Sequence, residues 1–495
     1  MTEWDEVVLV KGRSSKVTDY AIPALTLLVL IGTVLRFYNL DLSALWLDEA
    51  FTLNFSIASY GQIWENVIAG EFNPPLFYWM EHIMVSLFGD SEIVLRTLPA
   101  VFGILAIPVF YFIGKEFKDE YTGIVMAAMC TFSPFLIWYS QEARTYPLLL
   151  LLVAGATYYY FKGFRTGELK DWSLFAVLGA LAFWSHFYAL VIIGSMFLFA
   201  GIWFVVQKDL KPVLVSFCIY ILVSLPILVM VIPLFLKRTV TAPTYGYQGT
   251  TLIYEIFKNF AGFSDLMLPV FLFLFLLGII AAVRGGGWKG VFLIWIFVVT
   301  FLFSYMASAT IPMLPKYLIF MTIFFFLSIA LCYEYLAAYL PKGKDPVYAV
   351  LWMSVFFGLM SIPFATVYYS GGMKDDWRGV ATYLENKTQP YDIVVTVPNY
   401  AQLPLDYYYS AERDGTIEQP LDQKEPIRFL ELIQEQRSFI NGTTTTPTIY
   451  YVVTGDIAAV DPSGKMLNWL NHNATLLKEF NLGINIMKGV PENVL

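Results

Sequence analysis

The chain has little charge, little histidine and little cysteine. Of its 495 residues only 14% are charged, three are histidine and three are cysteine. The formal net charge of −8 leaves no basic excess to meet a nucleic-acid backbone. Cys130, Cys218 and Cys332 all lie within apolar stretches, which favours small core residues over disulfides or metal ligands. These shortages argue against a nucleic-acid-binding protein and against a disulfide-stabilised one.

Apolar residues are abundant instead. They make up 58% of the chain, against about 45–50%, glycine included, in an ordinary soluble domain. Apolar stretches of about 18 residues or more are typical of helices that cross a bilayer. No small-residue cleavage site follows the first stretch, so we interpret it as a retained span and not as a signal peptide. We predict an α-helical, multi-pass protein of the cell membrane with about eleven spans: 20–37, 94–114, 121–139, 147–162, 171–185, 187–206, 213–235, 267–283, 290–308, 316–338 and 346–369.

The segment 74–89, PPLFYWMEHIMVSLFG, is apolar but unlike the predicted spans. It opens with two prolines and carries Glu81 and His82 in its middle. A spanning helix needs about 20 residues, and a charge at the bilayer centre is costly. We therefore predict a short helix that lies in the outer interface of the membrane.

The inner loops support this choice of spans. With 74–89 left out, the N-terminus is cytoplasmic and the inner loops read KEFKDEY, KGFRTGELKD, QKDLK, RGGGWKG and PKGKD, each with at least two basic residues. Such a bias marks cytoplasmic loops. The first outer loop, about residues 39–93, and the C-terminal tail are then extracytoplasmic.

The composition changes after Tyr369. The segment DDWRGVATYLENKT has helical apolar spacing, whereas YDIVVTVP and TIYYVVTG are typical of buried strands. We predict a membrane domain over residues 1–369 and a small extracytoplasmic α/β domain over residues 370–495. Asn-x-Ser/Thr sequons, which mark exposed sites on the glycosylating side, begin at Asn54, Asn386, Asn441 and Asn473.

Two adjacent acids follow the first span. Asp48 and Glu49 lie in LWLDEAF, within the first outer loop. Carboxylates stabilise the start of a helix, which is one interpretation of the pair. The other is functional, because a carboxylate can bind a divalent cation or take a proton from an acceptor hydroxyl.

Five further polar residues fall at the outer ends of predicted spans. Arg144 in SQEARTY could extend to the interface and pair with Glu142, or bind a phosphate in bidentate fashion. Lys316 in LPKY has the same two interpretations. His186 in WSHFY is either a buried, hydrogen-bonded core residue or a ligand contact, and Arg96 could be structural or functional.

Taken together, these residues favour one kind of ligand. Acids, cations, a histidine and aromatic rings such as that of Tyr317 all fall on the outer side of the membrane. A lipid-linked phosphosugar has a charged head for Arg or Lys, a ring that stacks on Tyr or Trp, and an apolar tail that lies among helices. The pattern therefore indicates a site for such a lipid.

Six motifs, in order along the chain, resemble those of a known family. They are LWLDEAF, FNPPLFYW, SEIVLRTLPAVFGI, SQEARTYPLLLLL, SHFY and PKYLIF. They resemble the GT-C membrane glycosyltransferases, and within them the group of dolichyl-phosphate-mannose–protein mannosyltransferases and lipid A aminoarabinose transferases. The resemblance covers about residues 20–320, and the tail loosely. It implies inverting transfer of a sugar from a dolichyl or undecaprenyl phosphate to a protein, lipid or glycan acceptor at the outer face.

The resemblance also implies roles for the acids. Asp48 matches the acid of the first outer loop, which acts as a base or metal ligand, and Glu49 is its neighbour. Glu142 matches the second acidic site. A divalent cation (Mg²⁺, Mn²⁺ or Zn²⁺) would be held by Asp48 and Glu142, and members of the family differ in whether they use one.

The donor contacts follow from the same comparison. The phosphate would contact Arg144 and Lys316. Relatives usually carry His or Lys before the Pro-Pro pair, whereas this chain has Asn73. That departure shifts the expected contact to His186 or Arg96.

Two other classes of function remain to be weighed. A transporter or flippase of lipid-linked sugars should show internal repeats and ionisable groups near the bilayer midplane. The chain shows no clear repeat, and its charges gather at one face. A scaffold protein that binds through the outer domain leaves the motifs unexplained.

Overall fold

The computed structural model divides the chain into two compact units. One comprises residues 1–40 and 58–366, and the other residues 41–57 and 367–495. The residues described are 3–69, 73–207, 209–238, 245–341, 346–371, 373–389, 392–409, 417–420, 448–455, 457, 461, 464–480 and 484–489.

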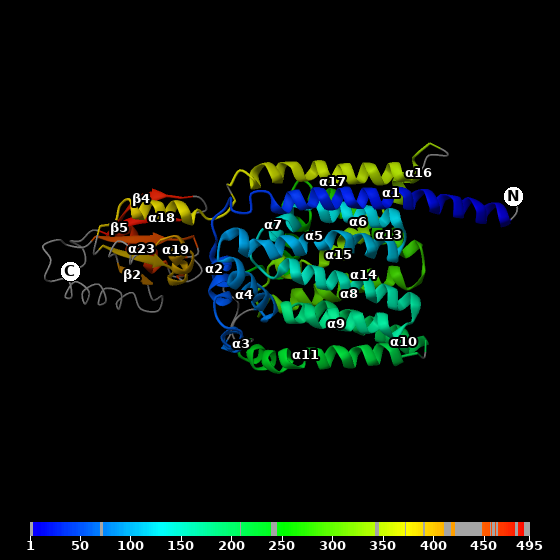
Figure 1. The fold of residues 1–495 in the computed structure, drawn as a ribbon, viewed down its shortest axis with the longest axis horizontal. Coiled ribbons are helices and arrows are strands. Elements are labelled where there is room, and N and C mark those ends of the chain that lie inside the picture. Colours follow the sequence, from blue (N-terminus) through cyan, green and yellow to red (C-terminus); the bar gives the residue numbers. More distant parts are fainter. Residues whose placement is uncertain are drawn as a thin grey trace. The chain divides into compact units, whose positions relative to one another are not determined.

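The first unit is a helical bundle. Its long helices run side by side, and α3, α4 and α7 lie at the end of the bundle opposite the N-terminal end of α1 (Figure 1). Its elements are α1 (Glu3–Phe37), α3 (Tyr60–Ala69), α4 (Leu76–Phe88), α5 (Glu92–Phe117), α6 (Glu120–Phe132), α7 (Pro134–Ser140), α8 (Tyr146–Thr166), α9 (Leu169–Ser185), α10 (Ala189–Gln207), α11 (Lys211–Arg238), α12 (Gly249–Phe260), α13 (Leu268–Arg284), α14 (Gly287–Ala307), η1 (Pro315–Leu318), α15 (Met321–Ala330), α16 (Tyr333–Ala338) and α17 (Val347–Tyr368).

Each of the predicted spans is helical, but fewer helices meet a strict test of length and apolarity. In the described part of the chain seven helices pass it, or eight if the bent pair of α6 and α7 is one span. Helices α9 and α13 have only 17 residues each, and α8 is rich in tyrosine and packs between α5 and α9. A helix enclosed by its neighbours needs no lipid-facing surface, so its sequence is less apolar.

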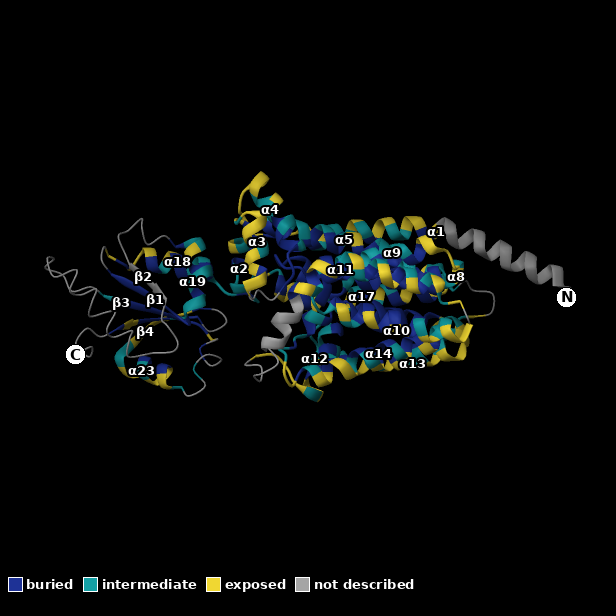
Figure 2. Cartoon of the chain, turned by 90° about the horizontal axis from the view of Figure 1, so that it is seen from below, coloured by how far each residue is buried: buried dark blue, intermediate teal, exposed yellow. Residues whose placement is uncertain are grey.

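The helices at the periphery of the bundle carry the surface expected to face lipid. Leu222, Val298 and Trp352, on α11, α14 and α17, are exposed by 71%, 57% and 70%. Bands of exposed residues alternate with buried ones along such helices (Figure 2). An exposed apolar band of this kind suits a bilayer and not water.

The segment 74–89 forms the short helix that was predicted. Helix α4 has 13 residues, a length of about 20 Å at 1.5 Å per residue, which is too short for a span. It begins after Pro75 and ends at Gly89, whose φ of +85° suits glycine. Glu81, however, is fully buried against the bundle, and its side chain does not reach the surface as an interfacial carboxylate would.

The predicted span 121–139 is not a single helix. It bends by 57° between α6 and α7. Pro134 has no N–H to continue the α6 hydrogen bonds, and the Ser133 hydroxyl accepts from the amide of Leu136 at 3.3 Å, which starts a new helix. The apolar run concealed this break.

The second unit contains a five-stranded mixed sheet in the order β2-β1-β3-β5-β4. Strand β1 pairs in parallel with β2 and β3, and β5 pairs antiparallel with β3 and β4. The predicted strands in YDIVVTVP and TIYYVVTG are confirmed as β1 and β3. The elements are α2 (Leu47–Ser56), α18 (Trp377–Glu385), β1 (Ile393–Val397), η2 (Asn399–Ala401), α19 (Gln402–Tyr408), β2 (Ile417–Pro420), β3 (Ile449–Val453), α23 (Lys465–Asn473), β4 (Ala474–Glu479) and β5 (Asn485–Gly489).

Residues 41–57 of the first outer loop are built into this second unit. The Arg378 guanidinium donates to the carbonyls of Asp41, Leu42 and Ser43. The Tyr408 hydroxyl accepts from the amide of Leu45 at 2.7 Å. The acid pair is therefore fixed to the same unit as the C-terminal sheet.

Three of the four sequons begin at an asparagine that is exposed or partly exposed to solvent. Asn54 and Asn386 are exposed and Asn473 is partly exposed. Asn441 lies outside the described residues.

Candidate functional site

Two buried cations and a histidine lie among tyrosines at one end of the bundle. Lys316, Arg144 and His186 are exposed by only 8%, 7% and 2%. The Lys316 ammonium lies 5.4 Å from the centre of the Tyr146 ring, and the His186 ring lies 5.8 Å from that ring and 5.5 Å from the Tyr317 ring. We call these five residues the cation–tyrosine cluster.

The cluster is built from the ends of helices. Tyr146 begins α8 with Pro147 behind it, His186 ends α9, and Lys316 lies in the 3₁₀ turn η1. The Thr145 hydroxyl donates to the carbonyl of Ser185 at 2.9 Å, which ties the start of α8 to the end of α9. The Tyr188 hydroxyl donates to the carbonyl of Pro312 at 2.8 Å, and the rings of Tyr188 and Tyr317 stack at 5.3 Å. Segments distant in sequence are thereby held together.

His186 is uncharged at neutral pH. Burial, with the positive charges of Arg144 and Lys316, lowers the pKa of its ring from 6.5 to about 3. Its Nδ1 accepts a hydrogen bond from the amide of Tyr188 at 3.2 Å, so the single proton of the neutral ring is on Nε2. His186 is therefore a hydrogen-bond donor through Nε2 and is poorly suited to act as a base or, in this tautomer, as a metal ligand.

Glu142 and Arg144 lie in a tightly held loop between α7 and α8. Glu142 is 1% exposed, and one of its carboxylate oxygens accepts from the Trp138 indole at 3.0 Å. The Trp138 ring packs on Phe263 and Phe364. The side-chain amide of Gln141 donates to three backbone carbonyls at the end of α1, at 2.9 to 3.3 Å. Glu142 is thus held by contacts at the α7 end of the loop.

Two other predicted contacts have a more structural character. Arg96 is 1% exposed and donates to the carbonyl of Leu40 at 2.6 Å. At least one of its N–H donors therefore satisfies a backbone carbonyl just after α1. Asn73 is 4% exposed and directly precedes Pro74. The bundle therefore brings together Arg144, His186, Lys316 and Tyr317, with Glu142 two residues before Arg144 in the chain, more clearly than Arg96 or Asn73.

The acid pair forms the first turn of α2, in the second unit. Glu49 is fully buried, accepts from the amide of Trp46 at 3.5 Å, and lies 4.0 Å from the Lys374 ammonium. These contacts fit the helix-start interpretation of Glu49. Asp48 is only partly buried. Lys374 was not identified from the sequence, where it is one of several charges after the last span.

Glu81 is a second buried acid that the motifs did not single out. It is fully buried, and neither carboxyl oxygen has a hydrogen-bond partner in the described part of the chain. Burial raises its pKa well above the ordinary 4.5. Burial therefore disfavours the ionised form of this side chain.

In the ranges that the structure describes, no three His, Cys, Asp or Glu side chains are grouped closely enough to hold a metal ion. The prediction that Asp48 and Glu142 bind a divalent cation stays a prediction.

Comparisons with known proteins agree with this architecture. Residues 73–236 match the family model described as dolichyl-phosphate-mannose-protein mannosyltransferase. No curated protein matches the chain well enough to count as a relative. Among solved structures, ArnT from Cupriavidus metallidurans bound to undecaprenyl phosphate is 12% identical with a TM-score of 0.56, over 95% of this chain and 98% of that one.

An archaeal enzyme is similar to the same degree. The Archaeoglobus fulgidus oligosaccharyltransferase complexed with Zn and sulfate is 12% identical with a TM-score of 0.56, over 94% of this chain and 72% of that one. The chain is thus a multi-pass integral membrane protein with the fold of the GT-C glycosyltransferases, which confirms the resemblance drawn from its motifs. Its match at the level of sequence is to the mannosyltransferase family model, over the stretch from Asn73 to residue 236.

Proposed function

We propose that this protein transfers a sugar from a polyprenyl phosphate to an acceptor at the outer face of the membrane. The observation that carries the proposal is the cation–tyrosine cluster, in which two cations and a neutral histidine donor are buried at helix ends within a GT-C fold. Among the structural neighbours, ArnT was solved with undecaprenyl phosphate and the oligosaccharyltransferase with an acceptor peptide. A polyprenyl phosphate and an acceptor are the two ligands that this chemistry would need.

The cluster supplies what departure of a phosphate requires. When the bond between sugar and phosphate breaks, negative charge grows on the phosphate oxygens, and fixed positive charge stabilises it most where water is excluded. We assign Arg144 and Lys316 to the phosphate oxygens. The Nε2–H of His186 donates a further hydrogen bond, which requires no proton transfer.

The tyrosine rings have a positioning role in this proposal. Tyr146 holds the Lys316 ammonium over its ring face. Tyr317, stacked on Tyr188, presents an aromatic surface suited to the apolar face of a sugar ring. The donor head group would then be fixed by both its charge and its shape.

The acceptor must lose a proton as it attacks, and we assign that proton to Asp48. The assignment rests on the resemblance of LWLDEAF to the family motif. A partly buried carboxylate has a suitable basicity for an acceptor hydroxyl or amine. Glu142 is the second acid, with its orientation set by Trp138. Attack from the face opposite the phosphate inverts the anomeric centre.

We further propose the orientation and the domain boundaries. Residues 1–369 form the catalytic membrane domain with a cytoplasmic N-terminus, and residues 370–495 an extracytoplasmic domain. Protease treatment of intact and of permeabilised cells tests this: only the tail should be cut in intact cells.

The function is tested with purified protein in lipid nanodiscs. Polyprenyl-phosphate mannose and polyprenyl-phosphate aminoarabinose are supplied with candidate acceptors, and mass spectrometry follows release of polyprenyl phosphate. Transfer by the wild type, with loss in Asp48→Asn, supports the proposal. Movement of the lipid-linked sugar across sealed vesicles, with its linkage unchanged, would instead show a flippase.

A further inference from the structure

Arg36 is a fully buried cation that neither the motifs nor the proposed mechanism uses. It lies in the last turn of α1 and has no solvent exposure. Its guanidinium donates to the carbonyls of Cys130 and Thr131 at 2.8 and 3.3 Å and to the Ser140 hydroxyl at 3.2 Å. It also donates to the carbonyl of Gly32, in its own helix, at 3.3 Å. A buried charge with this many partners needs an explanation.

Two of the acceptors of Arg36 are carbonyls that lose their helical hydrogen bonds at the bend between α6 and α7. In an unbroken helix the amide of residue 134 would donate to the carbonyl of Cys130, but Pro134 has no N–H. The carbonyl of Thr131 would likewise accept from Phe135 across the 57° bend. Arg36 donates to both carbonyls, and so replaces the hydrogen bonds that the break removes.

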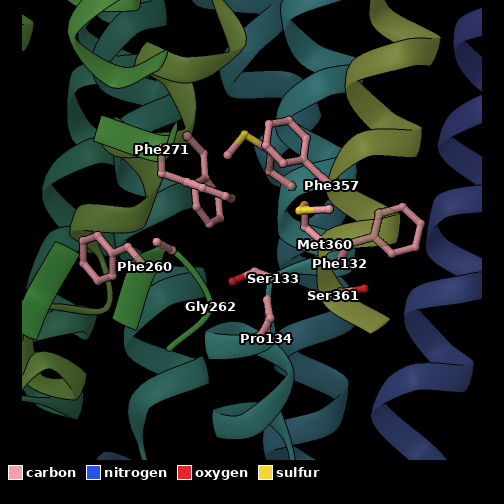
Figure 3. A pocket seen from close by; sticks show the side chains of 12 residues that line it. Phe132, Ser133, Pro134, Phe260, Gly262, Phe271, Phe357, Met360 and Ser361 are labelled. Carbon is pink, nitrogen blue, oxygen red and sulfur yellow. The ribbon is translucent and has the colours of Figure 1, made fainter. Parts of the chain in front are cut away.

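The other side of the break is mainly apolar. A cavity of about 20 Å³ lies there, lined mainly by apolar side chains (Figure 3). Of its two serine hydroxyls, that of Ser133 accepts from the Leu136 amide and that of Ser361 donates to the Gly358 carbonyl. The break is therefore stabilised from the α1 side.

Arg36 also holds the far end of α7. Its Nε donates to the Ser140 hydroxyl, and the backbone carbonyl of Arg36 accepts from the side-chain amide of Gln141 at 3.1 Å. Gly103 on α5 leaves the space for this contact, because a Cβ there would lie 2.9 Å from the Arg36 Nε and would collide with the Ser140 hydroxyl. One guanidinium thus contacts both the last turn of α6 and the last residue of α7.

We propose that Arg36 is a positioning residue that fixes the angle of α7 and thereby the placement of Glu142 and Arg144. The inference rests on the proposed function for its effect on catalysis, though not for its effect on α7. Displacement of a reacting group by about 1 Å can cost about 100-fold in rate. Loss of Arg36 should therefore lower kcat far more than it changes KM for the donor.

The first test measures α7 directly and needs no activity. Hydrogen–deuterium exchange is compared in wild type, Arg36→Gln and Gly103→Ala. We expect faster exchange confined to residues 134–145 in both variants. Arg165→Gln, at the exposed far end of α8, is the control and should not change exchange there. Exchange that is unchanged in 134–145, or equally faster throughout the bundle, would overturn the proposal.

The second test is a double-mutant cycle with Glu142→Gln. We expect Arg36→Gln to lower kcat about 100-fold in the wild-type background and by a clearly smaller factor when Glu142 is already replaced, because only the placement of Arg144 is then left to disturb. Arg36→Lys, which keeps the charge but has three N–H donors for the four acceptors of Arg36, should fall between. Equal losses in both backgrounds would overturn the positioning role. Full activity of Glu142→Gln alone would contradict the role of Glu142 in the proposed function, and the exchange data would then decide the inference about α7.

Discussion

Two regions of this molecule bury charge, and they do so for different reasons. In the second unit Glu49 starts a helix, accepts from the amide of Trp46 and faces the Lys374 ammonium. In the bundle, Arg144 and Lys316 are buried beside a histidine that burial, together with their positive charge, keeps neutral. The first arrangement satisfies a carboxylate, whereas the second concentrates positive charge.

The comparison separates structural from functional interpretations. A lysine or arginine at the end of a span commonly extends to the interface and keeps its head in water. Lys316 and Arg144 are more than nine-tenths buried, so this interpretation does not fit them. Glu49, in contrast, has the contacts of a residue that stabilises the start of α2. Burial and partners, more than residue type, distinguish the two cases.

The largest effect is expected within the acid pair. Asp48→Asn removes the proposed base and should lower kcat by about 10³-fold, with little loss of stability. Glu49→Gln should keep measurable transfer but lower the melting temperature, because it weakens the contacts to Trp46 and Lys374. Transfer rates and thermal unfolding of the two purified variants would separate the roles. Loss of activity in Glu49→Gln at unchanged stability would reverse the assignment.

A somewhat smaller loss is expected for the phosphate contacts. Lys316→Gln and Arg144→Gln should each lower kcat about 10² to 10³-fold, the range for removal of one group that stabilises developing charge. Arg96→Gln should mainly destabilise the protein, because that arginine donates to the carbonyl of Leu40. Initial rates and melting temperatures of the three variants make the comparison. A stable but inactive Arg96→Gln would move Arg96 into the site.

His186 should affect stability with pH more than it affects transfer. Below the ordinary pKa of 6.5 the unfolded histidine binds a proton, whereas the folded one, with a pKa of about 3, does not. Stability therefore falls as pH drops through that window. His186→Gln keeps a donor but does not titrate, so its stability relative to wild type should rise by about 3 kcal/mol between pH 7 and pH 4. Unfolding measured at several pH values checks this, and a constant difference would contradict it.

The smallest effect on transfer is expected for Glu81. Because burial raises its pKa, the folded carboxyl ionises at a higher pH than the unfolded one, so folding stability declines as pH rises above about 4.5. Glu81→Gln should raise the melting temperature, and more at pH 8 than at pH 5. Glu65→Gln, at an exposed position on α3, is the matched control. A Glu81→Gln variant that is less stable than wild type at pH 8 would show a charged, paired Glu81.

Parts of this structure could be predicted from sequence because their signals are local. The prolines before α4 and the charges within it predicted a short helix, and the β-branched runs predicted β1 and β3. Ser133–Pro134 carried a local signal for the break in the third span, but the apolar run around it was given more weight. Such a dipeptide inside a predicted span can mark a bend.

Other parts depend on contacts between distant segments. The neutral state of His186 depends on its burial and on the charges of Arg144 and Lys316 beside it. The fit of residues 41–57 into the second unit depends on Arg378 and Tyr408, more than 300 positions away. Arg36 looked like any cation at the end of a span. No neighbouring residue in the sequence indicates that its side chain donates hydrogen bonds to the last carbonyls of α6.

The most direct test of the central claim is binding of undecaprenyl phosphate, without any sugar or acceptor, to the purified protein. Its affinity for wild type and for the double variant Arg144→Gln/Lys316→Gln is measured by native mass spectrometry, with Arg165→Gln as the control. Each charge-assisted hydrogen bond lost is worth about 1.5–3 kcal/mol, so the double variant should bind at least about 100-fold more weakly. Equal affinity in a folded double variant would contradict the account, because the phosphate would then be held elsewhere.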